Sequence, residues 1–238
     1  MKTPSSIRNY RTVTSAQTDQ GWGVNLDQRP LLTPAGHLLL VPTKDLGTAI
    51  AGEWDRQRER IDPAMMAMTQ IANSAIDHIR PDPAPIAGQF RMILCHDMLC
   101  YRSDDPALAA RQSQKWQPWL DWAKTRYDAS FISTDRLIAI DQPDATIQRI
   151  MRRWHGFDHF QQAVLMMFAS GFNSAILAFA LAEGALDSDQ AFTISQLEVH
   201  YQMERWGREA KKLAETAKLK EIHDGRRFLD LLRKASEP

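Results

Sequence analysis

The chain has few cysteines and no excess of charge of either sign. Two cysteines, Cys95 and Cys100, occur in 238 residues, and a disulfide-stapled secreted protein normally carries more. Lys plus Arg and Asp plus Glu both number 29, so the formal net charge is zero. A nucleic-acid binder usually carries a basic excess that neutralises phosphates. We therefore expect a protein of a reducing compartment that does not bind nucleic acid.

Signatures of common catalytic sites are missing as well. The sequence has no glycine-rich loop ending in Lys-Ser or Lys-Thr, no G-x-G-x-x-G after a strand, and no G-x-S-x-G elbow. Met1 to Gln20 lacks both an apolar signal core and the Arg-rich pattern of a long transit peptide. We expect a bacterial cytoplasmic protein without a cofactor; a mitochondrial matrix protein with its presequence removed is the alternative.

One uncharged stretch, Ala163 to Ala182, is long enough to span a bilayer. Small and polar residues such as Ser170 and Asn173 lie near its middle, and neither an aromatic belt nor a Lys/Arg cluster flanks it. The pattern favours a buried central helix, within a predicted helix from Asp158 to Glu183, over a membrane span.

The beginning of the chain reads as strands and turns, which predicts an antiparallel meander. The four predicted strands are Val13–Gln17, Gly21–Leu26, Arg29–Thr33 and His37–Val41. Thr43 is a predicted N-cap of one helix, and Asp62-Pro63 opens a second.

The segment Arg80–Pro85 contains three prolines, which cannot continue a helix and indicate a domain boundary. Beyond them the pattern is mostly helical. The predicted elements are helices Pro106–Tyr127, Asp144–Trp154, Ser188–Thr216 and Ala217–Ala235, and a strand pair within Phe131–Ile140. We predict an α+β fold: a small N-terminal antiparallel β domain with two helices (residues 1–82), then a mostly α-helical C-terminal domain (residues 83–238).

Two groups of side chains invite a metal interpretation. Cys95 and Cys100 flank His96 and Asp97 but have no second pair, so two ordinary semi-buried thiols are favoured. His155 and His159 are four residues apart, yet Gly156 and Asp158 indicate a helix break between them.

Capping and packing are therefore the favoured roles at His155, Asp158 and His159, and we expect no metal. A metal-dependent hydrolase that uses these three residues is the alternative function.

Trp54 lies on a predicted apolar stripe with Leu46 and Ile50. We expect it to be a structural anchor. Replacing a buried Trp by Ala typically costs about 3–5 kcal/mol, and Trp54→Arg would also bury a charge.

Several segments, spread over the chain, resemble the Atp-twelve family in sequence and in order. They are Leu26–Gly36, Leu40–Thr43, Ala51–Asp55, Ile61–Pro63, Met68–Asp77, Leu99–Arg102 and Leu197–Gly207. One departure is Asp27-Gln28, where the family usually has Asp-Gly; Gln tolerates positive φ less well, so we expect a different or wider turn.

The resemblance implies a chaperone rather than an enzyme. Known family members bind the free α subunit of F-type ATP synthase and keep it from aggregating until β subunits arrive. The implied partner is that α subunit, and the implied protein is monomeric and works without ATP. An unassembled α subunit exposes apolar surface that β later buries, and such surface drives aggregation.

The predicted helix from Ser188 supplies the candidate binding residues. Ile194, Leu197 and Tyr201 share its predicted core side. The polar stripe beside it consists of Glu198, Gln202 and Arg205. Spacing alone favours a solvated stripe in which Glu198 faces Gln202 and Arg205.

The resemblance instead implies that Glu198, in the Leu-Glu-x-x-Tyr-Gln element, matches the family's essential acid. Its expected role is recognition of a basic or hydrogen-bond-donating group on α. Gln202, Glu204 and Arg205 complete the predicted partner-binding set. Glu204 is the second candidate acid, and it could pair instead with Arg208.

Overall fold

The computed structural model describes residues 7–136, 139–206 and 212–233. The chain divides into two compact units. The first comprises Met1–Pro83, His159–Val164 and Asp224–Pro238, and the second comprises Ala84–Asp158 and Leu165–His223. The predicted boundary between residues 82 and 83 stays a prediction. The fold class is α+β, as expected from the sequence, with a small antiparallel sheet followed by a mostly helical region.

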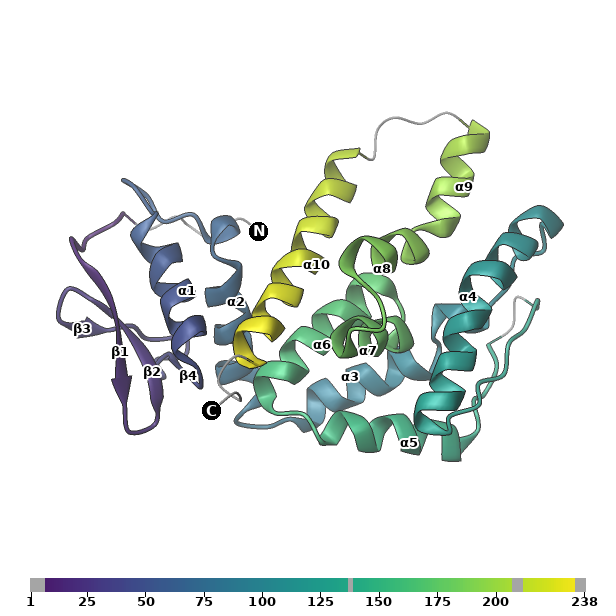
Figure 1. The fold of residues 1–238 in the computed structure, drawn as a ribbon, viewed down its shortest axis with the longest axis horizontal. Coiled ribbons are helices and arrows are strands. Elements are labelled where there is room, and N and C mark those ends of the chain that lie inside the picture. The colour runs from purple at the N-terminus through teal and green to yellow at the C-terminus, as the bar shows by residue number, and fades with distance from the viewer. Residues whose placement is uncertain (1–6, 137–138, 207–211, 234–238) are drawn as a thin grey trace. The chain divides into compact units, whose positions relative to one another are not determined.

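The first unit is built on a four-stranded antiparallel sheet (Figure 1). Its strands are β1 (Val13–Thr18), β2 (Gly21–Leu26), β3 (Arg29–Pro30) and β4 (Leu40–Val41). β2 pairs with β1 along its whole length and with both short strands, β3 and β4. The antiparallel sheet is confirmed, but the predicted meander is wrong in its last step, because β4 pairs with β2 and not with β3. The last two strands are also shorter than predicted.

The Asp27–Gln28 turn is different from the family's Asp-Gly turn but not wider. Leu26 pairs directly with Arg29, so the turn has two residues. Asp27 has a positive φ of 56°, and its carboxylate accepts hydrogen bonds from the backbone N–H groups of Arg11 (3.0 Å) and Thr12 (2.9 Å). Asp tolerates left-handed backbone better than most residues do, which explains how the turn stays short without glycine.

Helix α1 (Lys44–Asp55) packs against β1 and β2. Its N-cap is Thr43, as predicted, whose hydroxyl accepts from Leu46 N at 3.1 Å. In the same unit the Thr43 hydroxyl donates to the carbonyl of Leu231 at 2.8 Å, in α10 (Lys212–Arg233).

The second predicted helix begins later than Asp62-Pro63 suggested. Pro63–Met65 forms only a 3₁₀ turn, η1, and helix α2 spans Ala67–Ser74. The buried carboxylate of Glu53 accepts from the N–H groups of Met68 (2.7 Å) and Thr69 (2.8 Å), which are two free donors of the first turn. A side chain from α1, rather than a local cap, therefore sets the start of α2.

Helix α2 continues into a π-helical turn, η2 (Ala75–Ile79). Asp77 in this turn accepts from the hydroxyl of Thr33 (2.5 Å) and the N–H of Ala35 (3.0 Å), and lies 3.0 Å from His37 Nδ1. Burial raises the pKa of Asp77, but these hydrogen bonds outweigh it and leave the pKa below its usual value. Asp77 thereby ties the loop after β3 to the helix.

The second unit is helical. Its elements are α3 (Ala84–Cys95), the 3₁₀ turn η3 (Met98–Cys100), α4 (Pro106–Tyr127), α5 (Asp144–His155), the later part of α6 (His159–Phe172), α7 (Ala175–Glu183), α8 (Ser188–Ser195), α9 (Leu197–Trp206) and the start of α10. Its core contains Phe90, stacked on Trp154 at 4.1 Å between ring centroids, and Phe179.

Asp97 is buried in this unit with no exposed surface. Its carboxylate accepts from the Ser174 hydroxyl (3.0 Å) and from the N–H groups of Ile176 (3.0 Å) and Leu99 (3.1 Å). Burial raises the pKa of Asp97 to about 6 despite these hydrogen bonds. One carboxylate thus joins η3 to the first turn of α7.

The predicted single helix from Asp158 to Glu183 is wrong, because the chain breaks between α6 and α7. Asn173 has a left-handed φ of 53°, and Ser174 caps α7 by accepting from Leu177 N at 3.1 Å. Ala175–Ala182 is buried throughout, as the sequence predicted for this stretch. In the part of the chain that the structure describes, no helix is long and apolar enough to cross a membrane.

The predicted strand pair within Phe131–Ile140 is absent from the described part of that segment. Thr134 makes an isolated bridge with Tyr101. The Gln142 side chain donates to the carbonyl of Ile132 and accepts from its N–H, both at 2.9 Å. A side-chain amide therefore occupies the backbone groups that a neighbouring strand would need.

Candidate functional site

Helix α4 begins at a strong cap that also contacts α9. Asp105 is the N-cap and accepts from the N–H groups of Ala107 (2.9 Å) and Leu108 (3.4 Å). Its other carboxylate oxygen accepts from the Tyr201 hydroxyl at 3.0 Å and from Arg205 at 2.5 Å. The hydrogen bond from Tyr201, followed by the other donors, lowers the pKa of Asp105, so this group is a carboxylate at neutral pH.

Two further polar contacts join the same helices. Gln112 donates to Glu198 with 2.6 Å between Nε2 and Oε1. Arg111 pairs with Glu204 at 2.6 Å, and its guanidinium lies 5.0 Å from the ring centroid of Tyr201. We call this set the α4–α9 face. It comprises Asp105, Arg111 and Gln112 on α4, and Glu198, Tyr201, Glu204 and Arg205 on α9.

The acids and bases of α9 do not pair along the helix as spacing predicted. Glu198 bonds to Gln112 and Arg205 to Asp105, so the predicted contacts of Glu198 with Gln202 and Arg205 are wrong. Gln202 is exposed. Glu204 pairs with Arg111, whereas Arg208, its predicted alternative partner, lies outside the described residues.

The predicted helix Ser188–Thr216 is interrupted at Gln196, which separates α8 from α9. The indole N–H of Trp116 donates to the carbonyl of Ile194 at 3.2 Å. In an uninterrupted helix that carbonyl would accept from the N–H of Glu198. Ile194 and Tyr201 therefore belong to different helices, and Glu198 lies in the first turn of its own helix.

Sequence reasoning placed Glu198, Gln202, Glu204 and Arg205 on one helix, and the structure keeps them on α9. It missed Gln112, Asp105 and Arg111, the residues of α4 that hold this helix. Asp105 carried a signal, because an Asp before a Pro is a common start of a helix. Nothing local in the sequence connects Gln112 with Glu198, 86 residues later.

An apolar groove lies between α4 and α8, next to the α4–α9 face. Its volume is about 610 Å³. Its apolar lining is Pro118, Trp119, Ala185, Leu186, Ile194 and Leu197. The Trp119 ring is half-buried and lies 6.3 Å from that of Trp122, centroid to centroid. The groove reaches the residue that precedes Glu198.

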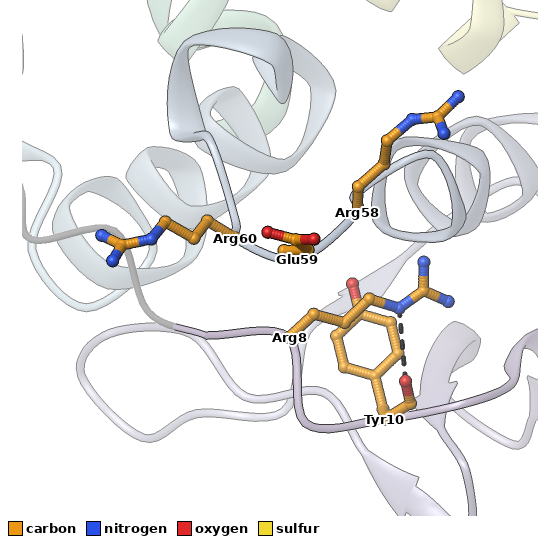
Figure 2. Close-up of a pocket in the computed structure, with 5 residues that line it drawn as sticks. All are labelled: Arg8, Tyr10, Arg58, Glu59 and Arg60. Atoms are coloured by element: carbon orange, nitrogen blue, oxygen red, sulfur yellow. Dashed lines mark hydrogen bonds between the residues drawn. The ribbon is translucent and has the colours of Figure 1, made fainter.

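A second hollow, of about 700 Å³, lies in the first unit and is lined by Arg8, Tyr10, Arg58, Glu59 and Arg60. The Arg8 guanidinium donates to carbonyls of Tyr10, Asp55 and Gln57, so its role is to hold backbone. Figure 2 shows Arg58 and Arg60 extending away from each other. The basic side chains therefore do not converge on a common ligand.

Trp54 lies half-buried on α1. Its ring centroid is 5.9 Å from that of Tyr10, whose hydroxyl donates to the Trp54 carbonyl at 2.7 Å. Leu46 and Ile50 on the same stripe have no exposed surface. The role of Trp54 as a structural anchor stays a prediction.

The candidate metal ligands are separated by a helix break, as expected. Helix α5 ends at His155 and α6 begins at His159. Across residues 7–136, 139–206 and 212–233, no three His, Cys, Asp or Glu side chains are grouped so that they could hold a metal ion. Burial raises the pKa of the Cys100 thiol far above its usual value, which makes this cysteine unreactive.

Comparisons with known proteins give a consistent result. The model of the family described as ATP12 chaperone protein matches residues 7–124. The crystal structure of Atp12 from Paracoccus denitrificans is 34% identical, with a TM-score of 0.89 over 95% of this chain and 98% of that one.

The crystal structure of the Atu1473 protein from Agrobacterium tumefaciens is 33% identical, with a TM-score of 0.90 over 97% of this chain and 88% of that one. The mitochondrial protein atp12 of Schizosaccharomyces pombe is 26% identical over 197 residues, which is 77% of this chain and 68% of that protein. With more than 30% identity over nearly the full length of a solved Atp12, this chain belongs to the ATP12 chaperone family.

Proposed function

We propose that this chain is an assembly chaperone that binds the free α subunit of F-type ATP synthase without ATP and prevents its aggregation until β subunits arrive. Membership of the ATP12 chaperone family supports this proposal. We further propose that it acts as a monomer in the bacterial cytoplasm and is not an enzyme.

The observation that links the proposal to a site is the exposure of Glu198 and its lack of a cationic partner. It is exposed, and its one hydrogen bond to a described side chain comes from the neutral amide of Gln112. By contrast, Glu204 pairs with Arg111 and Asp105 with Arg205. Among the described residues of the α4–α9 face, Glu198 is therefore the acid whose charge no cation neutralises.

An unneutralised carboxylate on an exposed helix can bind a basic or hydrogen-bond-donating group of a partner. The apolar groove that begins at Leu197 lies next to it and offers surface for apolar side chains. Together they suit a client that exposes apolar surface with a donor beside it. We assign the recognition of the α subunit to Glu198, with Gln202 and Arg205 beside it.

The test is Glu198→Gln, which keeps the shape of the side chain and removes its charge. Gln can still accept from Gln112, so normal folding and an unchanged circular dichroism spectrum are expected. Light scattering of purified α subunit should then show that wild type suppresses aggregation and that this variant does not.

Glu204→Gln is the matched control, because it removes a charge from the same helix that Arg111 already neutralises. It should protect α as wild type does. If Glu204→Gln loses protection and Glu198→Gln keeps it, Glu204 is the recognition acid. Co-expression of wild type should also raise soluble α and leave soluble β unchanged; failure to reduce α aggregation under any condition would contradict the function itself.

A further inference from the structure

We propose that Gln112 is a positioning residue for Glu198: its side-chain amide holds the carboxylate in the orientation that the partner binds. This inference rests on the proposed recognition role of Glu198. It extends the site from α9 to α4 and assigns a function to a residue that is otherwise part of the core.

Gln112 is held at both ends of its amide. It is 1% exposed, and its Oε1 accepts from the backbone N–H of Ser103 at 2.7 Å while its Nε2 donates to Glu198 at 2.6 Å. A backbone N–H can only donate, so the oxygen end of the amide must face Ser103. The NH₂ end must then face Glu198, and the donor is fixed in place.

The neutral character of this donor matters. An Arg or Lys at the same position would hold the carboxylate but also neutralise it, as Arg111 does for Glu204 and Arg205 does for Asp105. Gln112 holds one oxygen, Oε1, without cancelling the charge. Among the residues that the structure describes, the second oxygen of Glu198 has no hydrogen-bond partner, so it is left for a ligand.

Holding the side chain before binding also favours affinity. A free Glu side chain loses rotamer entropy when a partner immobilises it, and a carboxylate that is already held loses less. Removing the donor should therefore weaken binding even though the acid and its charge remain.

The experiment measures the dissociation constant of purified α subunit for Gln112→Met, which keeps the length and apolar stem of the side chain and removes both the donor to Glu198 and the acceptor of the Ser103 N–H. We expect binding about tenfold weaker than wild type, the size of one hydrogen bond to a charged group. Gln112→Asn, whose amide is one methylene too short to reach Glu198, is the second variant should Gln112→Met fail to fold.

Tyr201→Phe is the matched control, because it removes one polar contact between the same two helices, the bond to Asp105, without touching Glu198. Within α9 it also removes a longer contact from Arg205, at 3.4 Å, and Arg205 keeps its ion pair with Asp105. We expect its affinity for α to stay within about twofold of wild type. If Tyr201→Phe weakens binding as much as Gln112→Met does, Gln112 acts only by docking α9, and the inference is overturned.

A double-mutant cycle separates positioning from general destabilisation. Glu198→Asp keeps the charge but withdraws the carboxylate from Gln112, so adding Gln112→Met to it should change the affinity by less than about twofold. An additive loss would overturn the inference. Glu198→Gln measured in parallel tests the proposed function separately. If Glu198→Gln binds α like wild type, the proposed recognition site is wrong. If Glu198→Gln loses binding while Gln112→Met binds like wild type, only the positioning role of Gln112 is refuted.

Discussion

Two carboxylates of the helical unit, Asp97 and Glu198, are both bonded to other elements, but with opposite consequences. Asp97 is fully buried and its oxygens accept from Leu99, Ser174 and Ile176. Glu198 is exposed and accepts from Gln112. A buried acid must give its acceptor sites to the fold, because an unsatisfied one is costly. An exposed acid can keep a site for a partner.

The largest expected effect follows from removing the buried carboxylate of Asp97. Asp97→Ala leaves three donors of η3 and α7 without their acceptor, and we expect a loss of about 3–5 kcal/mol in the free energy of unfolding. Urea denaturation followed by circular dichroism measures it. Asp187→Ala, which removes the exposed cap of α8, is the control and should cost about 1 kcal/mol. Equal losses for the two variants would show that the buried carboxylate of Asp97 stabilises the fold no more than an exposed helix cap does.

Trp54 tests the sheet unit in the same way. It is half-buried against Tyr10, so Trp54→Ala should cost about 2–4 kcal/mol, near or below the range for fully buried aromatics. Trp54→Arg adds a charge at the same place, and we expect insoluble protein from expression trials. A melting temperature of Trp54→Arg within one or two degrees of wild type would instead favour a binding role for this side chain.

The pH dependence of stability sharpens the comparison. Burial raises the folded-state pKa of Asp97 from 3.8 to about 6. The protonated form of Asp97 therefore adds to the free energy of unfolding. This addition, up to ~3 kcal/mol, is fully present below about pH 4 and is lost as pH rises through about 6. Asn at position 97 does not titrate. As pH rises from about 4 through about 6, the unfolding free energy of wild type should therefore fall relative to that of Asp97→Asn. Because Glu53, whose pKa burial also raises, titrates in both proteins, its effect cancels.

The smallest effect is expected at the exposed face. Arg205→Gln removes the ion pair with Asp105. The Arg205 side chain is 56% exposed and that of Asp105 is 29% exposed. Exposed ion pairs add little to the free energy of unfolding, and salt screens them. The melting temperature should therefore fall by no more than about 4 °C at low salt and by less at 1 M salt. A large, salt-independent fall would mean that the α4–α9 face is part of the structural core.

The sequence predicted those parts of the fold that local patterns specify. The β1–β2 hairpin, the Thr43 cap of α1 and the start of α4 at Pro106 follow from turn residues, caps and periodicity. The predicted helix Ser188–Thr216 failed because Trp116, distant in sequence, takes the Ile194 carbonyl. The predicted start of the second helix failed because Glu53 caps α2 from another helix. Both errors have one cause: a side chain from elsewhere supplied the hydrogen bond.

By itself, the sequence determined the α+β class, the family resemblance and the position of Glu198 on a helix near the end of the chain, because these depend on residue order and local spacing. Tertiary structure alone decided which acids are neutralised. Asp97, which in the sequence is only a neighbour of two cysteines, is a fully buried acid in the structure. Glu198 was left without a neutralising cation among the described residues, because folding placed Gln112 opposite it. Charge pairing depends on distances in space, and spacing along one helix does not specify them.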